Sequence, residues 1–173
     1  MLIVMSGLPG SGKSTLAQAL APRLPATILN KDSARAALFP SSDITYTPHQ
    51  DDFVVHILLQ VAEFYFEQDP QRKVILDGRT FYRQYQVTQV LDFCRLHERP
   101  VAFIACTCPD EIACERLKSA QRSGEHPAAD RNYELYQRMK VQSELLEIPH
   151  LRVDTSQALE LCIQISLHYL QSL

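Results

Sequence analysis

Residues 7–14 read Gly7-Leu8-Pro9-Gly10-Ser11-Gly12-Lys13-Ser14 and match the phosphate-binding pattern G-x-x-x-x-G-K-[ST]. The match follows an apolar, strand-like run at residues 2–5 and precedes a helical pattern, which is the context that such a loop requires. Its glycines allow backbone N–H groups to turn toward phosphate oxygens at the start of a helix. We therefore expect a nucleotide to be bound by Gly7, Leu8, Pro9, Gly10, Ser11, Gly12, Lys13, Ser14 and Thr15.

Two positions of the loop have more specific expected roles. Lys13 can reach the β- and γ-phosphates, and we expect its side chain to face solvent when no ligand is bound. Ser14 can ligate Mg²⁺. Asp77 ends a second apolar run at residues 74–76, where a carboxylate can hold Mg²⁺ directly or through water. Because Gly78 follows, the alternative for Asp77 is a turn or helix-capping residue.

The chain alternates short apolar runs with helical patterns, which is typical of βαβ units. Strands are predicted at residues 2–5, 27–29, 74–76, 101–107 and 151–153. Helices are predicted from a capping box at Thr47, from Pro109, and over residues 82–97, 131–145 and 156–170. This order predicts an α/β fold, a three-layer sandwich in which helices cover both faces of a five-stranded parallel sheet.

Length and composition indicate one globular domain over residues 1–173. Hydrophobic residues make up 46% and charged residues 21% of the chain, which favours neither disorder nor a membrane protein. The net charge of −3 lacks the basic excess of a nucleic-acid binder. The five cysteines form an odd number, and the first residues do not resemble a signal peptide. We therefore expect a cytoplasmic protein with reduced thiols.

A polar motif follows the second predicted strand, at the edge of the sheet where α/β proteins bind ligands. Asp32 and Arg35 lie three residues apart, so they share one face of a helix that starts there. The carboxylate could orient and deprotonate an attacking hydroxyl, and the guanidinium could bind an anionic group of the substrate. The alternative is an ordinary helix start with Asn30 as its N-cap and Asp32 as a first-turn acid.

Residues 119–131 interrupt the alternation of strands and helices. This segment is polar and includes Gly124 and Pro127, with Arg122 and Arg131 on either side of the turn. We expect a short lid over the nucleotide in which these arginines act on the phosphoryl group, and the alternative is a simple connection between two helices.

In order along the chain, the motifs GLPGSGKST, NKDSAR, VILDG and VDTS resemble the P-loop kinases of the AAA_33 group. That group includes polynucleotide 5′-hydroxyl kinases and zeta-toxin-like kinases. The resemblance implies ATP and Mg²⁺ as cofactors and a nucleotide-kinase-like strand order of 2-3-1-4-5. It also implies that Lys13 and Ser14 bind the nucleotide and the metal, that Asp32 is the general base and that Arg35 lies at a substrate phosphate. Lid arginines would come from among Arg116, Arg122 and Arg131.

Two features depart from familiar members of this group. Arg79 follows the acidic end of a strand, where it could bind the acceptor, and this is not a feature of polynucleotide kinases. The similarity to adenylyl-sulfate kinases is looser, because Asn30-Lys31-Asp32 replaces their acidic-glycine-acidic motif.

We expect an ATP-dependent kinase whose acceptor is a hydroxyl group. A small molecule is the first choice because the chain is short and mildly acidic. A nucleic-acid 5′-hydroxyl is the alternative, and a nucleotide-driven ATPase or switch without an acceptor is the second alternative. No membrane partner is expected.

Overall fold

The computed structural model describes residues 1–123 and 132–173, within which the strands form one parallel sheet. The strands are β1 (Leu2–Ser6), β2 (Ala26–Asn30), β3 (Lys73–Asp77), β4 (Val101–Thr107) and β5 (Leu151–Asp154). Their order across the sheet is β2-β3-β1-β4-β5. All the expected strands are confirmed to within about a residue at each end, and so is the strand order implied by the resemblance.

Helices connect the strands on both sides of the sheet. They are α1 (Lys13–Leu20), α2 (Lys31–Leu38), α3 (Pro48–Gln68), α4 (Gln84–Leu96), α5 (Asp110–Ser123), α6 (Tyr133–Val141) and α7 (Leu159–Gln171). Two short 3₁₀ turns, η1 (Ala21–Arg23) and η2 (Ser41–Asp43), complete the described elements. Within these residues, no helix combines the length and the apolar character needed to cross a bilayer.

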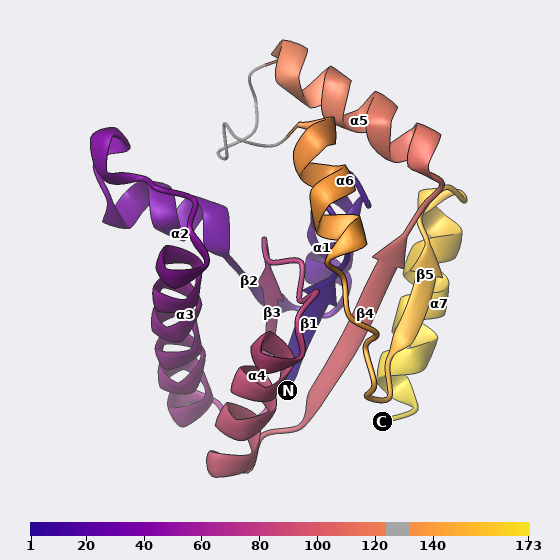
Figure 1. The fold of residues 1–173 in the computed structure, drawn as a ribbon. Coiled ribbons are helices and arrows are strands. Elements are labelled where there is room, and N and C mark those ends of the chain that lie inside the picture. Colours follow the sequence, from indigo (N-terminus) through magenta and orange to yellow (C-terminus); the bar gives the residue numbers. More distant parts are fainter. Residues whose placement is uncertain (124–131) are drawn as a thin grey trace.

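Successive side chains of β1 point to opposite faces of the sheet, and helices cover each face. Leu2 and Val4 pack into one core with residues of α3 and α4, and Ile3 and Met5 pack into the other core with residues of α1 and α7. All four side chains are fully buried, and each contributes about 1.5–3 kcal/mol to folding. Figure 1 shows the resulting sandwich, with α3 and α4 on one side of the sheet and α7 on the other.

Two helices are shorter than the sequence predicts. The helix expected over residues 131–145 ends at Val141, because Glu144 turns away and its backbone N–H donates to the carbonyl oxygen of Tyr82 at 2.9 Å. The helix expected from residue 156 begins at Leu159. Its delayed start follows from a turn in which Ser156 donates from both its N–H and its hydroxyl to one carboxylate oxygen of Asp154.

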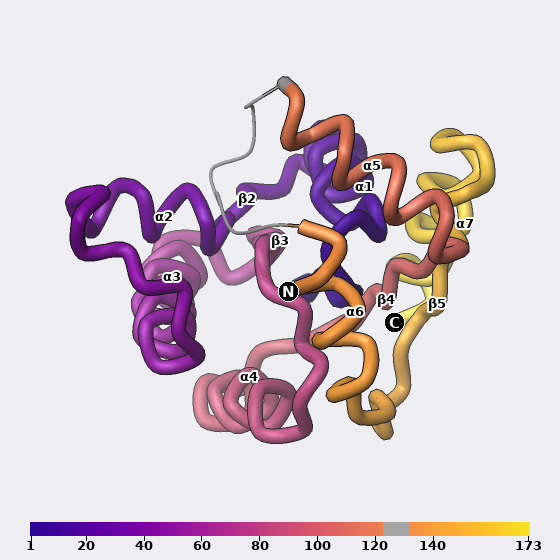
Figure 2. Tube along the Cα trace, turned by 45° about the horizontal axis from the view of Figure 1, so that its top comes forward, coloured from indigo at the N-terminus to yellow at the C-terminus, as the bar shows by residue number. Residues whose placement is uncertain are grey.

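The start of α3 is fixed differently from a full capping box. The hydroxyl of Thr47 accepts from the N–H of Gln50 at 3.3 Å, as expected. The Gln50 side chain does not return to Thr47; it accepts from the N–H of Thr45 and donates to the carbonyl oxygen of Asp43. This pairing ties α3 to the chain that leaves α2. Figure 2 shows α2 and α3 together on one side of the carboxyl edge of the sheet and α5 and α6 on the other.

Candidate active site

The phosphate-binding loop joins β1 to α1 at the carboxyl edge of the sheet. Gly12 has φ 75° and forms the left-handed cap of α1. Gly7 has φ 136° and approaches β4 so closely that a Cβ there would lie 2.4 Å from the carbonyl oxygen of Cys106. Both positions therefore require glycine. The buried hydroxyl oxygen of Ser11 has no hydrogen-bond partner among the described residues.

The other loop residues differ in their exposure to solvent. Pro9 is buried, Leu8 and Ser14 are half-buried, and Thr15 is exposed on the first turn of α1. Ser14 is thus placed at the helix N-terminus with its side chain partly open. Its expected role as a Mg²⁺ ligand and the contacts of residues 7–15 with a nucleotide stay predictions.

Lys13 does not face solvent, contrary to expectation. Its side chain is only 2% exposed, and its Nζ donates to the carbonyl oxygen of Leu8 at 3.3 Å. The side chain folds back across the loop because a loop carbonyl offers a nearby acceptor for the ammonium group. The ammonium is therefore held in the loop, where an arriving phosphate would meet it.

Asp77 lies at the end of β3, beside the phosphate loop, and is 2% exposed. One carboxylate oxygen accepts from the Nδ2 of Asn30 at 2.7 Å, and the other is buried without a hydrogen-bond partner among the described residues. A buried, unpartnered carboxylate oxygen suits a hard cation such as Mg²⁺, which prefers oxygen ligands. No group of three or more His, Cys, Asp or Glu residues within ranges 1–123 and 132–173 could hold a metal. Mg²⁺ usually keeps waters and phosphates as its other ligands, so Asp77 and Ser14 fit it.

Cys106 lies behind the loop, near the end of β4, and is buried. Burial raises the pKa of its thiol to about 12, against a smaller opposing effect of Lys13. The thiol therefore stays protonated at neutral pH and packs as an apolar group. This agrees with the expectation of reduced, structural thiols.

Asn30 places the first turn of α2 against β3. Its side-chain oxygen accepts from the N–H groups of Asp32 and Ser33 at 3.0 Å each, which makes it the N-cap of α2. The same side chain donates to Asp77. Both residues end paired strands, with Asn30 opposite Asp77 in the register of β2 and β3. Asn30 is thus the N-cap of α2, as in the alternative interpretation of this motif. It also links the first turn of α2 to Asp77 at the end of β3.

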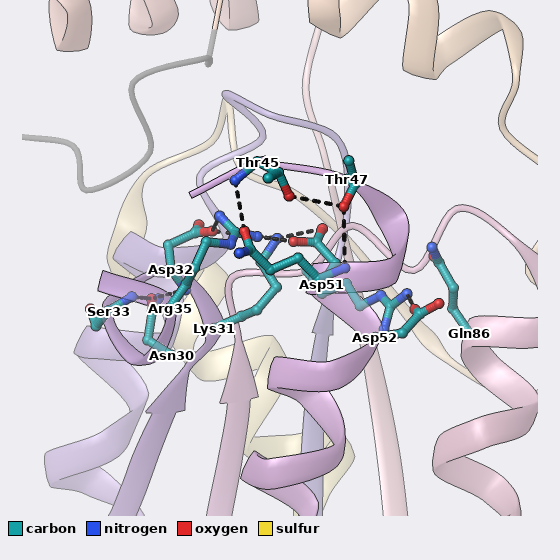
Figure 3. A network of polar contacts seen from close by, with 12 residues as sticks. Asn30, Lys31, Asp32, Ser33, Arg35, Thr45, Thr47, Asp51, Asp52 and Gln86 are labelled. Atoms are coloured by element: carbon teal, nitrogen blue, oxygen red, sulfur yellow. Dashed lines mark hydrogen bonds and ion pairs between the residues drawn. The ribbon is translucent and has the colours of Figure 1, made fainter. Parts of the chain in front are cut away.

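Asp32 and Arg35 face each other in a ring of alternating charges (Figure 3). Arg35 contacts Asp32 Oδ1 at 3.1 Å, and Lys31 contacts the same oxygen at 3.3 Å. Asp51, in the first turn of α3, closes the ring by pairing with both Lys31, at 2.8 Å, and Arg35. The side chains of Asp32 and Arg35 are each only 3% exposed. Removing one charge from this network would leave its partners buried without compensation. The ion pairs therefore hold the side chains in one arrangement.

Arg79 is directed toward α3 and α4. Its guanidinium pairs with Asp52, and a second nitrogen donates to Gln89 at 3.5 Å. The side chain is 2% exposed, and its guanidinium carbon lies 5.8 Å from the ring centroid of Phe81. Arg79 is thus held in a salt bridge that the sequence did not indicate, and its expected role in binding the acceptor stays a prediction.

Sequence reasoning missed Asp51 and Asp52. The two acids follow directly after the capping residues of α3, where first-turn carboxylates are common because they favour the helix dipole. The available signal was the adjacent acidic pair itself, near the start of the helix predicted from Thr47.

Arg116 of α5 bridges the phosphate loop and the turn after β5. It donates to the carbonyl oxygen of Gly10 at 3.3 Å, to the hydroxyl of Thr155 at 3.0 Å and to the carbonyl oxygen of Thr155 at 2.8 Å. Thr155 in turn donates to the carbonyl oxygen of Ser11 at 2.8 Å. Arg116, one of the expected lid arginines, therefore contacts the loop in the structure.

The other two expected lid arginines are placed differently. Arg122 is exposed in the last turn of α5. Arg131 lies outside the described residues, as does residue range 124–131 of the expected lid. The catalytic roles of Arg122 and Arg131 stay predictions.

A cavity of about 350 Å³ opens between the phosphate loop and α6. Gly7 and Ser11 line it on the loop side, and Tyr136 and Lys140 line it on the α6 side. Lys140 and the hydroxyl of Tyr136 both contact Asp110 of α5, at 2.6 and 2.7 Å. The hydrogen bond from Lys140 holds the pKa of Asp110 below its usual value. This contact fixes α6 over the loop.

A family model matches residues 2–145 of the chain; the family is AAA_33, described as an AAA domain. No curated protein matches the chain.

Solved structures resemble the chain over nearly its full length. A protein of Chloroflexus aurantiacus j-10-fl, named only provisionally as a kinase, is 22% identical, with a TM-score of 0.75 and 96% of each chain covered. The gluconokinase of Sinorhizobium meliloti 1021 is 18% identical, with a TM-score of 0.70, covering 98% of this chain and 91% of its own. The APS kinase CysC of Mycobacterium tuberculosis, solved with AMPPNP and APS, is 18% identical, with a TM-score of 0.72, covering 98% and 96%. The chain therefore has the fold of the P-loop kinases.

Proposed function

The chain belongs to the AAA_33 family, and from this premise we propose that it is an ATP-dependent kinase that phosphorylates a hydroxyl of a small molecule. The observation that carries the proposal is a pair of buried oxygens without hydrogen-bond partners among the described residues. They are Ser11 Oγ in the phosphate loop and one carboxylate oxygen of Asp77 at the neighbouring strand end. Buried polar atoms are nearly always partnered in native proteins, so a bound group would supply the partner that each of these oxygens lacks. A nucleotide phosphate and its Mg²⁺ fit the two positions.

The loop and Lys13 would hold the phosphates of ATP. Backbone N–H groups at the start of α1 and the ammonium of Lys13 supply positive charge where the β- and γ-phosphates arrive. Ser14 and Asp77 would hold Mg²⁺, which when bound neutralises phosphate charge. Lys13 is already fixed in the loop, so it requires little reorganisation as charge develops.

Asp32 would bind the acceptor hydroxyl and receive its proton. Its carboxylate is held by Lys31 and Arg35 at the N-terminus of α2, next to the strand end that bears Asp77. A hydroxyl fixed there is positioned for in-line attack, and positioning supplies most of the catalysis in phosphoryl transfer. Arg122 and Arg131 remain proposed lid arginines, and Arg116 adds a positive charge at the loop itself.

The gluconokinase and the APS kinase support a small-molecule acceptor by the substrates in their names. The chain's mild negative charge is consistent with that choice. Among the contacts of residues 1–123 and 132–173, none favours the polynucleotide or switch alternatives over it.

The proposal is tested by measuring ATP consumption with pooled hydroxyl compounds and, separately, with 5′-hydroxyl oligonucleotides. We expect the small-molecule pool to raise turnover, and Lys13→Ala to abolish that rise. The matched control is Lys118→Ala, which removes an exposed lysine of α5. Lys13→Ala should lower the melting temperature by only a few degrees, because it removes a hydrogen bond worth about 0.5–1.5 kcal/mol. Unchanged turnover in Lys13→Ala would refute the phosphate-loop assignment, and stimulation by oligonucleotides alone would refute the small-molecule acceptor.

A further inference from the structure

Three basic side chains gather at the acceptor end of the site. Lys31 and Arg35 come from α2, and Arg79 follows β3; each is at most 7% exposed. A cluster of buried cations beside a phosphoryl-transfer site would ordinarily indicate an anionic acceptor. The resemblance to other kinases implies the same role for Arg35.

The structure compensates each of these cations with a carboxylate. Lys31 and Arg35 share Asp32 and Asp51 in the closed ring, and Arg79 pairs with Asp52. Within the described residues, these six paired side chains carry three positive and three negative charges. Two of the three carboxylates come from the start of α3: Asp51 lies in its first turn and Asp52 follows directly.

Each of the two arginines keeps one N–H donor outside these ion pairs. The Nε atoms of Arg35 and Arg79 are buried and have no hydrogen-bond partner among the described residues. The ring of Tyr46 lies 5.0 Å from the guanidinium carbon of Arg35 and covers one face of it. An N–H donor of this kind can bind an alcohol or ether oxygen. An incoming anion would instead meet the carboxylates of Asp32 and Asp51 at Arg35 and that of Asp52 at Arg79, and like charges at such a contact are strongly unfavourable.

We propose that Asp51 and Asp52 are specificity-determining residues that reserve this end of the site for an uncharged, polyhydroxylated acceptor and exclude carboxylates and phosphate esters. The inference names the acceptor class of the proposed kinase and so rests on that function. The exclusion of anions, however, is a property of binding, and it can be tested without measuring phosphoryl transfer.

The test is a calorimetric titration of sodium sulfate into protein saturated with Mg²⁺ and AMPPNP, at constant ionic strength. Saturation with AMPPNP blocks the phosphate loop, so that sulfate reports on the acceptor end. We expect Asp51→Asn to bind sulfate with a dissociation constant lower by about tenfold or more than the wild type, because one guanidinium and one ammonium lose a carboxylate partner. Asp92→Asn is the matched control: it removes a carboxylate that pairs with an arginine on the exposed face of α4.

Asp52→Asn provides a second, separate variant in case Asp51→Asn does not fold, because it breaks the ion pair with Arg79 and leaves the Lys31–Asp32–Arg35–Asp51 ring intact. The proposal is overturned if the wild type already binds sulfate as tightly as the folded variants. A companion screen offers ATP with sorbitol and gluconate, and with glucose and glucose 6-phosphate. A preference of the wild type for an anionic member would also overturn it. If sulfate binding follows the expected pattern but no acceptor is phosphorylated, the proposed kinase activity is refuted and the exclusion of anions is not.

Discussion

We expect Asp32→Asn to leave ATP binding intact and to lower phosphoryl transfer by roughly 10²- to 10⁴-fold, the range for loss of a general base. Asparagine keeps the shape of the side chain and removes the proton acceptor. ATP affinity should persist because Asp32 pairs with Lys31 and Arg35, which belong to α2 and not to the phosphate loop.

The structure also sets the expected loss of stability. Removing one partner from a buried ion pair costs about 3–5 kcal/mol when the other charge is left alone. Here Lys31 and Arg35 both keep Asp51, and the asparagine oxygen can still accept a hydrogen bond, so the cost should be nearer to that of one charged hydrogen bond, about 1.5–3 kcal/mol. For a chain of this size, a loss of about 2 kcal/mol lowers the melting temperature by about 4–8 °C.

Single-turnover transfer at 25 °C, ATP binding by calorimetry and denaturant unfolding separate the rate, affinity and stability effects. Ile163→Val is the control, because it trims a buried side chain of α7 on the opposite face of the sheet and costs about 0.5–1.5 kcal/mol. It should destabilise the protein without slowing transfer. A variant at position 32 that loses ATP affinity yet transfers normally at saturation would show that Asp32 belongs to the nucleotide site, and our assignment would be wrong.

Two further predictions concern the loop and its surroundings. Arg116→Ala should raise the dissociation constant of ATP about tenfold, because the loop loses the hydrogen bond that Arg116 donates to the carbonyl oxygen of Gly10; an unchanged constant in calorimetry would contradict this role. Cys106 and Cys94 should resist alkylation at pH 8, since burial raises each thiol pKa to about 12 and leaves only about one thiolate in 10⁴. Peptide mapping after iodoacetamide treatment checks this, and labelling of Cys106 in the folded protein as fast as free cysteine would disprove it.

The elements that the sequence predicts well are those encoded by neighbouring residues. The phosphate loop is a contiguous motif, and the pairing of Asp32 with Arg35 follows from helical spacing alone. The sheet order came from resemblance, because hydrophobic patterns define strands without placing them side by side.

What the sequence did not reveal depends on contacts between distant segments. Asp51 pairs with Arg35 because α3 packs beside α2. The local sequence pattern of either helix does not predict that ion pair. Lys13 was expected to face solvent without a ligand because it acts on phosphate charge. Its Nζ instead donates to the carbonyl oxygen of Leu8, a contact that depends on how the loop folds. The early end of α6 has the same origin, since Glu144 is held by the chain before α4.

Asn30 connects the two chemical ends of the site through a single amide. Its nitrogen holds the carboxylate proposed to bind the metal, and its oxygen holds the first turn of the helix that carries the proposed base. A shift of Asp77 as it takes up a cation would be transmitted to the position of Asp32 across one rigid, planar group. Occupancy of one end is thus thermodynamically linked to the geometry of the other, and such linkage is reciprocal. Asn30→Asp separates the two roles, because a carboxylate can still cap α2 but cannot donate to Asp77.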